Sequence, residues 1–227
     1  MILSIIIPAY NEKKTIMEII KRVERVKLNK IKKEIIIVDD GSTDGTRDIL
    51  KKNKKHKVIF HSINMGKGAA IVTGINNSKG EIIIIQDADL EYNPKNYLNL
   101  IMPIIEGKSE VVYGTRLLGQ HINMYFHHYI GNYILTIMTN MLYNSKITDM
   151  ETGYKVFKRK TLQGIRLKSK GFDIEPEITA KLLKRGNKIL EVPINFSTPR
   201  KFNEGKKISY IDGIRAVFSL LKYRFVD

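Results

Sequence analysis

The stretch EIIIIQDADLEYNP, residues 81–94, places four consecutive isoleucines directly before three carboxylates at alternate positions. The isoleucines predict a strand over 81–87 that is buried on both faces, as in a parallel sheet covered by helices. Side chains two residues apart on a strand point to the same side. If the extended geometry continues through Glu91, the carboxylates of Asp87, Asp89 and Glu91 lie together at the carboxyl end of the strand. Like charges this close repel one another unless a positive charge lies among them.

Strands and helices alternate through the first half of the chain. Hydrophobic patterns predict strands over 2–8, 34–40, 57–62, 81–87 and 110–116, with helices over about 12–27, 43–53, 66–78 and 94–106. This order predicts an α/β fold with a mostly parallel, doubly wound central sheet flanked by helices. Ligands of such sheets bind beyond the carboxyl ends of the strands. Polar clusters follow four of the predicted ends, at residues 8–12, 39–42, 87–91 and 114–116, so we expect a site at this edge.

Composition restricts the partners of the protein. The 227 residues carry 39 Lys and Arg against 23 Asp and Glu, a net charge of +16, which indicates an anionic partner or a strong solubilising field. The chain has no cysteine, which excludes disulfides and thiolate metal sites. Met1 leads directly into a strand-like segment, so we expect no signal peptide.

The second half is less regular. Residues 117–145 contain no Asp, Glu, Lys or Arg, yet their histidines and asparagines are polar for a bilayer interior. We therefore expect an amphipathic helical pair packed on the domain rather than a membrane span. The spacing of apolar residues over 208–225 predicts a helix. This helix either packs on the core or is a basic amphipathic surface helix. The cationic run PRKFNEGKK, 199–207, has the chemistry of a lid over a diphosphate.

Several polar residues are candidates for binding. Carboxylate oxygens are ligands that Mg²⁺ and Mn²⁺ prefer, and a metal would relieve the repulsion among the three acids. Asp40, at a strand end, can accept hydrogen bonds from a base or ribose. Gly66-Lys67-Gly68 resembles a phosphate-cradling loop but lacks the full P-loop spacing, and close helix packing by small residues explains Gly68, Ala69 and Ala70 more simply. Arg116 and Arg200 each end a patterned segment, and guanidinium groups bind phosphate bidentately.

Taken together, these segments resemble family 2 glycosyltransferases with the Rossmann-like, nucleotide-sugar-binding GT-A fold, in the polyprenyl-phosphate (dolichol-phosphate) mannose synthase branch. The matching segments are IIIPAYNE, IIIVDDGSTDGT, NMGKGAA, IIIIQDADLEY, VVYGTR, DMETGYKVFKR, GFDIEPEI, and VPINFSTPR followed by EGKK. They cover nearly the whole chain in the order of the family. The resemblance implies one catalytic domain over 1–227, with a nucleotide-binding half to about 116 and an acceptor and lid half over about 117–227.

The resemblance also assigns roles to residues. The nucleoside would be held by Pro8, Tyr10, Glu12, Val38 and Asp40. The acidic motif Asp87, Ala88 and Asp89 would bind metal and diphosphate, with Glu91 as a third metal ligand where relatives often have Gln or Ser. The donor or acceptor phosphates would be contacted by Arg116, Arg200 and Lys206. The catalytic set would be Asp89, Arg116 and Arg200.

The implied activity is inverting, metal-dependent transfer of a hexose, mannose or glucose, to a polyprenyl or dolichyl monophosphate. The donor would be GDP-mannose or UDP-glucose, and the cofactor Mg²⁺ or Mn²⁺. We expect a cytoplasmic protein bound peripherally at the cytoplasmic face of a membrane surface. The sequence identifies no membrane-spanning partner.

Three other functions are compatible with parts of the sequence. A family 2 enzyme that glycosylates a saccharide or protein hydroxyl would need a general base, for which Asp149, Glu151 or Glu177 could serve. A nucleic-acid-binding protein is suggested by charge alone, but no recognised binding motif is present and the acids would repel a phosphate backbone, so we expect no nucleic acid partner. A catalytically silent nucleotide-sugar binder is distinguished only by turnover assays.

Overall fold

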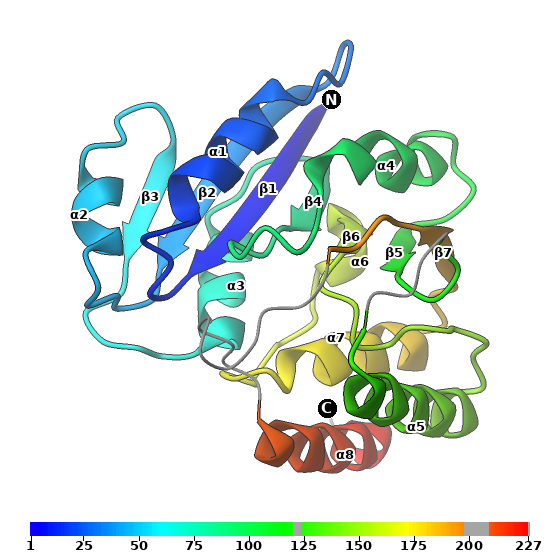
Figure 1. Ribbon diagram of the computed structural model, residues 1–227. Coiled ribbons are helices and arrows are strands. Elements are labelled where there is room, and N and C mark those ends of the chain that lie inside the picture. Colours follow the sequence, from blue (N-terminus) through cyan, green and yellow to red (C-terminus); the bar gives the residue numbers. More distant parts are fainter. Residues whose placement is uncertain (120–123, 198–208, 227) are drawn as a thin grey trace.

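The protein is described by a computed structural model over residues 1–119, 124–197 and 209–226. In this part of the chain seven strands form one sheet of order β3-β2-β1-β4-β6-β5-β7 (Figure 1). The strands are β1 Ile2–Ala9, β2 Lys32–Asp39, β3 Lys57–Phe60, β4 Ile82–Ile85, β5 Val111–Thr115, β6 Lys155–Lys158 and β7 Ile189–Pro193. Strand β6 runs antiparallel to both neighbours, and the other pairs are parallel. The predicted mostly parallel α/β sheet is confirmed.

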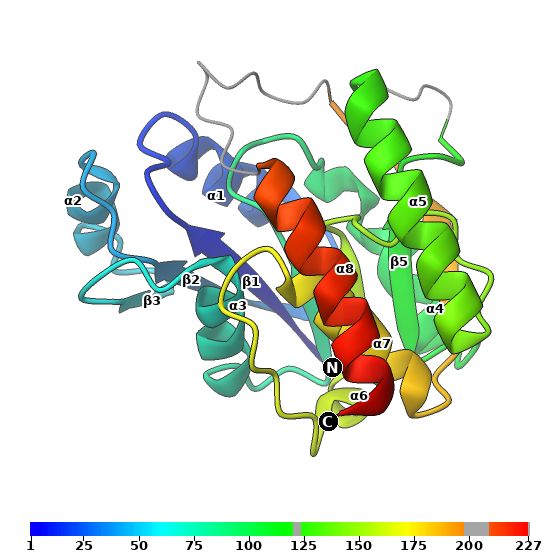
Figure 2. The same cartoon turned by 90° about the horizontal axis from the view of Figure 1, so that it is seen from below.

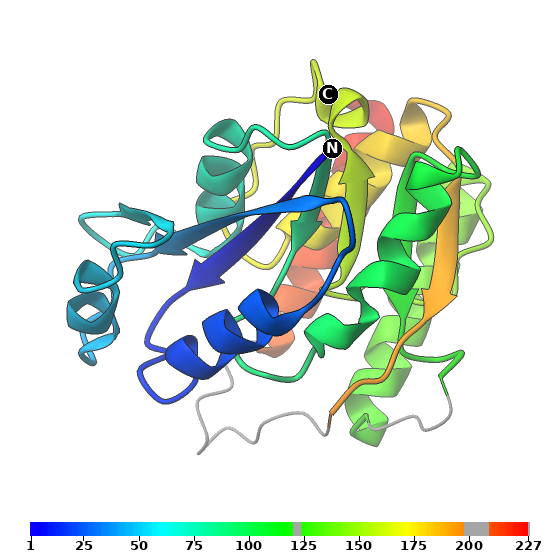
Figure 3. The ribbon, with the colours of Figure 1, turned by 90° about the horizontal axis from the view of Figure 1, so that it is seen from above.

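Helices cover both faces of the sheet. Their bounds are α1 Ile16–Arg25, α2 Thr46–Lys51, α3 Lys67–Asn76, α4 Tyr97–Ile105, α5 Phe126–Tyr143, α6 Arg159–Leu162, α7 Ile174–Lys184 and α8 Tyr210–Phe225, with a 3₁₀ turn over Pro94–Asn96 before α4. Helices α1 and α4 lie over one face (Figure 3), and α3 and α7 over the other. Helices α5 and α8 pack outside α7 and lie side by side (Figure 2). The second half of the chain therefore adds an outer layer to one face.

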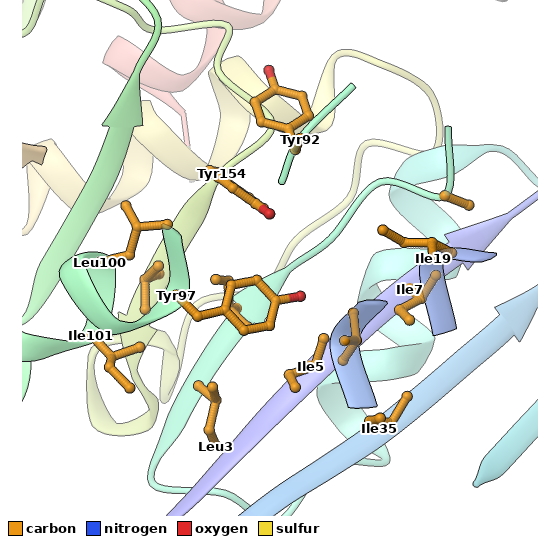
Figure 4. Close-up of a cluster of buried hydrophobic side chains, with 14 of the residues drawn as sticks. Leu3, Ile5, Ile7, Ile19, Ile35, Tyr92, Tyr97, Leu100, Ile101 and Tyr154 are labelled. Atoms are coloured by element: carbon orange, nitrogen blue, oxygen red, sulfur yellow. The ribbon is translucent and has the colours of Figure 1, made fainter. Parts of the chain in front are cut away.

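Alternation along the central strands builds both cores. Ile5 and Ile7 of β1 pack toward α1 and α4, against side chains such as Ile19 and Tyr97 (Figure 4). Ile6, between them, points to the opposite face, where the core includes residues of α3 and α7. Because the sheet is covered on both sides, its central strands are isoleucine runs rather than alternating apolar and polar residues.

The expected extension of the fourth strand is wrong. Strand β4 ends at Ile85, and residues 88–91 turn, with Leu90 at a φ of 71°. Gln86 explains the early ending, because its side-chain amide donates to the carbonyls of Asp87 and Tyr92 across the turn. Its amide oxygen accepts from the hydroxyls of Tyr97 and Tyr154 at 2.7 Å each. The three acids are consequently arranged on a turn, not along one face of a strand.

The uncharged segment over 117–145 forms one helix in its described part, so the expected helical pair is corrected there. Helix α5 runs for 18 residues without an internal break, because Gly131 is tolerated inside it and Asn144 ends it in the left-handed conformation. The helix expected over 208–225 is confirmed as α8, and one face of it packs on the core through Ala216, Leu220 and Tyr223. No helix in the described ranges combines the length and the apolarity needed to cross a membrane.

Candidate active site

A cavity of about 580 Å³ opens at the edge of the sheet where the strands carrying the predicted motifs end. Eight of the predicted nucleotide- and metal-binding positions line it together with Arg116: Pro8, Tyr10, Glu12, Asp40, Asp87, Ala88, Asp89 and Glu91. Val38 does not line it, because this side chain is fully buried in β2 and packs with Ile36 and Ala70. Arg200 and Lys206 lie outside the described residues. Eight predicted positions and Arg116 therefore line one cavity, and Val38 supports it from the core, while their roles in binding stay predictions.

Asp40 is engaged by the loop that precedes α3. Its carboxylate accepts from His61 Nδ1 at 2.7 Å and from the backbone N–H groups of Met65 and Gly66 at 2.9 and 2.7 Å. His61 Nε2 lies 3.0 Å from the hydroxyl of Thr73 on α3. Asp40 thus fixes the loop and the start of α3. The proposed contact with a base or ribose must use its remaining acceptor capacity, since a carboxylate offers about four acceptor positions.

A lysine neutralises the first acid of the motif. Lys67 Nζ lies 2.9 Å from Asp87 Oδ1 and 3.1 Å from Glu175 Oε1, and the other oxygen of Glu175 lies 2.7 Å from Lys155 Nζ. Burial lowers the pKa of Lys67, but attraction to Asp87 and Glu175 prevails and raises it above the ordinary value. From the sequence, neither Lys67 nor Glu175 was assigned a role. The GKG motif was the available signal for Lys67, and Glu175 lies in the segment GFDIEPEI, which carried part of the family resemblance.

The acids fit a divalent cation by their chemistry. Gly153 lets Asp87 approach, because a Cβ at this glycine would lie 2.3 Å from Asp87 Oδ2. Asp89 Oδ1 accepts the N–H of Glu91 at 3.1 Å, which orients the turn. All three offer the oxygen ligands that Mg²⁺ and Mn²⁺ prefer, and Lys67 is a cation already in place at Asp87. No three or more Asp, Glu or His side chains of the described chain are grouped as a ready-made metal cluster, so Glu91 as third ligand stays a prediction.

Arg116 is held by a buried carboxylate. Its Nε and Nη2 donate to Asp149 at 2.8 and 2.7 Å, and its backbone N–H donates to the same side chain. The guanidinium also lies 5.4 Å from the ring centre of Phe196. Burial alone would raise the pKa of Asp149, but the charge and hydrogen bonds of Arg116 lower it below the ordinary value. Arg116 lines the cavity, and its Nε and Nη2 already donate to Asp149. Its contact with phosphate stays a prediction.

Only one of the three candidate general bases fits that role by position. Asp149 is occupied by Arg116, and Glu177 accepts the N–H groups of Lys168 and Ser169 and pairs with Lys181. Glu151 lines the cavity, and its Oε1 is buried without a hydrogen-bond partner among the described residues. Burial raises its pKa from 4.5 to about 7, opposed by the charge of Lys155.

Glu151→Gln is expected to stabilise the protein at alkaline pH and to have little effect near pH 4.5. The folded protein holds the proton of Glu151 more tightly than the unfolded chain, so stability is lost as pH rises from 4.5 through about 7. Removing the carboxylate should restore up to about 3 kcal/mol above pH 8. Urea unfolding of both proteins at pH 5 and 8.5 measures the difference, with Glu106→Gln as a control for loss of an exposed carboxylate. A pH-independent difference would contradict the assigned burial cost.

Comparisons with known proteins indicate the family of the chain. Residues 4–166 match the family model described as "Glycosyl transferase family 2". The chain is 30% identical over 224 residues to an uncharacterized protein of Methanocaldococcus jannaschii, covering 96% of this chain and 90% of that protein. It is 31% identical to a UDP-N-acetylglucosamine–dolichyl-phosphate N-acetylglucosaminyltransferase of Methanococcus voltae, covering 84% and 83% of the two chains.

Two further matches concern a longer enzyme and a solved structure. A dolichol-phosphate mannosyltransferase of Pyrococcus furiosus is 28% identical over 229 residues, which are 97% of this chain and 64% of that enzyme. A glucosyl-3-phosphoglycerate synthase of Mycobacterium tuberculosis, solved with Mn²⁺, UDP and phosphoglyceric acid, superposes with a TM-score of 0.76 at 18% identity. That match covers 99% of this chain and 79% of the other, and it supports the fold alone.

Proposed function

Because the chain belongs to glycosyltransferase family 2, we propose that it transfers a hexose from a nucleotide sugar to a polyprenyl monophosphate. The transfer would invert the anomeric carbon and require Mg²⁺ or Mn²⁺. GDP-mannose and UDP-glucose are the proposed donors. The mannosyltransferase and N-acetylglucosaminyltransferase relatives, both named for dolichyl phosphate chemistry, support a lipid phosphate as the class of acceptor.

The observation that carries the proposal is the composition of the cavity wall. Its lining includes Asp87, Lys67 and Arg116, which suit a metal and phosphates. The lining also includes residues of α5 and α8, such as Leu135 and Gly213. Both helices expose large apolar side chains, so the cavity lies next to charged residues and next to a partly apolar exterior. An acceptor with a phosphate head and a hydrocarbon tail matches both.

The chain then acts mainly by positioning charges. A phosphate monoester is largely ionised near neutral pH, since its second pKa is about 6, and its oxygen can attack without a general base. Lys67 and Arg116 supply positive charge beside the space where two phosphates must approach. A divalent cation, held by Asp87 and Asp89, would supply Lewis-acid stabilisation of the departing diphosphate. Arg200 and Lys206, outside the described residues, are proposed to contact phosphate as well.

The direct test is a panel of sugar nucleotides incubated with a short polyprenyl phosphate, with and without Mn²⁺. Metal-dependent formation of a polyprenyl-phosphate sugar by one donor supports the proposal. Transfer to free saccharides or to a peptide hydroxyl, with none to the lipid phosphate, would overturn it.

Glu151 supports a second candidate function, transfer to a hydroxyl acceptor. Its raised pKa and its place in the cavity suit a general base that operates near neutral pH. The two functions differ in their response to Glu151→Gln. Transfer to a hydroxyl would lose two or more decades of rate, on the order of the contribution of general-base catalysis. Transfer to a phosphate acceptor would be largely retained.

Peripheral membrane association is proposed at the outer surface of α5 and α8. Helix α5 exposes Phe126, Tyr133, Ile134 and Met141, and α8 exposes Ile211, Ile214, Phe218 and Phe225. Phe218 is 68% exposed and Met141 is 79% exposed. Arg215, Lys222 and Arg224 of α8 supply positive charge for anionic headgroups. The location at the cytoplasmic face of a membrane stays a prediction.

Phe218→Glu is expected to weaken binding to anionic lipid vesicles by at least about tenfold. Withdrawing one large apolar side chain from lipid costs about 1.5–3 kcal/mol, and the added negative charge is repelled by the headgroups. Vesicle sedimentation at low and high salt measures the partitioning. Met17→Glu is the matched control, because Met17 is 40% exposed on α1, which covers the opposite face of the sheet. Equal loss in both variants would remove α8 from the membrane contact.

A further inference from the structure

The first turn of α3 positions the side chain of Lys67 and does not form a phosphate-binding loop. A Cβ at Gly66 would lie 2.3 Å from the carbonyl oxygen of Lys170, and one at Gly68 would lie 2.4 Å from that of Ser169. Gly66 also adopts a φ of 99°. Two N–H groups in the first turn of the helix, at Gly68 and Ala69, donate to the carbonyls of Gly171 and Lys170 at 3.2 Å each. These N–H groups are therefore already used, and the glycines serve to press α3 against residues 169–171.

This packing brings Lys67 within reach of two acids from distant parts of the chain. Its side chain is 16% exposed and lies between Asp87, after β4, and Glu175, on α7. Glu175 is shared with Lys155, which is fully buried. The four groups sum to zero charge, with two ammonium groups and two carboxylates. The charges of these four groups balance one another only while the ammonium group of Lys67 lies beside Asp87.

We propose that Lys67 is a counter-ion that exchanges partners, neutralising Asp87 in the ligand-free protein and moving to the donor diphosphate when a divalent cation binds Asp87. This inference rests on the proposed sugar-nucleotide function. Mg²⁺ binds its oxygen ligands at about 2.0–2.1 Å, so a divalent cation at Asp87 competes with the ammonium group that lies 2.9 Å from Asp87 Oδ1. The two positive charges repel at such a distance.

Metal binding at Asp87 would then leave one of the two ammonium groups without a carboxylate of its own. Glu175 would face both Lys67 and Lys155, and a single carboxylate balances only one of them. Lys67 lines the cavity on a flexible four-carbon stem, whereas Lys155 is also held by the carbonyls of Met150 and Thr152. Lys67 is therefore the group that can turn toward an incoming phosphate. Glu151, which lines the same cavity, adds negative charge when it is ionised.

The exchange couples the metal to the nucleotide. In the ligand-free protein the cation must displace Lys67, so metal alone binds weakly. A nucleoside diphosphate accepts the displaced ammonium, so each ligand strengthens the binding of the other by the same factor. Removing the lysine should relieve the competition and diminish the coupling.

The test is Mn²⁺ binding, followed by the paramagnetic signal of free Mn²⁺, with no nucleotide and with saturating GDP or UDP. Lys67→Met is expected to bind Mn²⁺ at least about tenfold tighter than wild type without nucleotide, because the competing charge is gone. Its gain in Mn²⁺ affinity on adding the nucleotide should be smaller than in wild type. Lys67→Arg keeps the charge and should resemble wild type. Lys51→Met is the control for net charge, because Lys51 pairs with Asp48 on the surface.

Unchanged or weaker Mn²⁺ binding by Lys67→Met without nucleotide would overturn the exchange. Circular dichroism checks that the variant is folded, and Glu175→Gln is a second variant if it is not. With Glu175 neutral, Lys67 should pair with Asp87 alone and weaken Mn²⁺ binding, so tighter binding would refute the proposal. Transfer to polyprenyl phosphate is assayed separately on wild type. Its absence would refute the proposed acceptor without touching the metal result.

Discussion

Asp89→Asn is expected to reduce metal-dependent sugar transfer by roughly a thousandfold while the protein remains folded. The substitution removes a negative charge from the proposed cation site. A loss of about 4 kcal/mol of transition-state stabilisation corresponds to this factor. The fold should survive because an asparagine oxygen can still accept the N–H of Glu91, the hydrogen bond that Asp89 Oδ1 makes in the turn. Turnover and Mn²⁺ binding in the presence of nucleoside diphosphate measure the effect.

A matched control separates the site from general loss of acidic charge. Asp48→Asn removes a carboxylate that is 74% exposed on α2, and it should leave turnover unchanged. Wild-type turnover by Asp89→Asn would remove Asp89 from the catalytic set. A large fall in its melting temperature would instead assign it a structural role.

Asp149→Asn is expected to lower the free energy of unfolding by about 3–5 kcal/mol, because it leaves the buried guanidinium of Arg116 without its counter-charge. Asp149 is fully buried, and Arg116 makes two short side-chain hydrogen bonds to it. For a chain of this size the melting temperature should fall by roughly 10 °C, at about 2–4 °C per kcal/mol. Chemical denaturation and thermal unfolding both report the change.

Glu18→Gln is the matched control for a broken ion pair. Glu18 pairs with Arg22 at 2.8 Å, but both side chains are about 40% exposed, so solvent screens the pair and the expected loss of stability is small. If Asp149→Asn were equally mild, the buried pair would contribute little to stability. The guanidinium of Arg116 would then be available to turn toward a ligand.

The sequence predicted the first half of the fold well because local pattern and tertiary environment agree there. The isoleucine runs of β1, β2 and β4 are buried on both faces, and the turn residues after them mark the edge of the sheet. The end of β4 was missed because it depends on Gln86, whose partners Tyr97 and Tyr154 are 11 and 68 residues away. No periodicity in residues 81–94 reports these contacts.

The site was predicted as a set of positions but not as a set of interactions. Eight of the expected binding residues line the cavity with Arg116 because strand ends converge in space. The pairing of Lys67 with Glu175 depends on α3 packing against residues 169–171, about a hundred residues further along the chain. The engagement of Arg116 by Asp149 is likewise long-range. Residue type and spacing indicate which chemistry is present, whereas counter-ions are chosen by the assembled fold.

Strand β6 has a consequence for how the chain acquires its shape during synthesis. It inserts antiparallel between β4 and β5, although both of these strands precede it in the sequence by dozens of residues. Until residues 155–158 leave the ribosome, the four isoleucines of β4 have an open edge on one side, and an unpaired apolar edge invites pairing with other chains. The predicted division near residue 116 is therefore not a place where the chain could be cut. In a nascent or truncated first half, β4 would be an edge strand, and it would be the most aggregation-prone strand of the sheet.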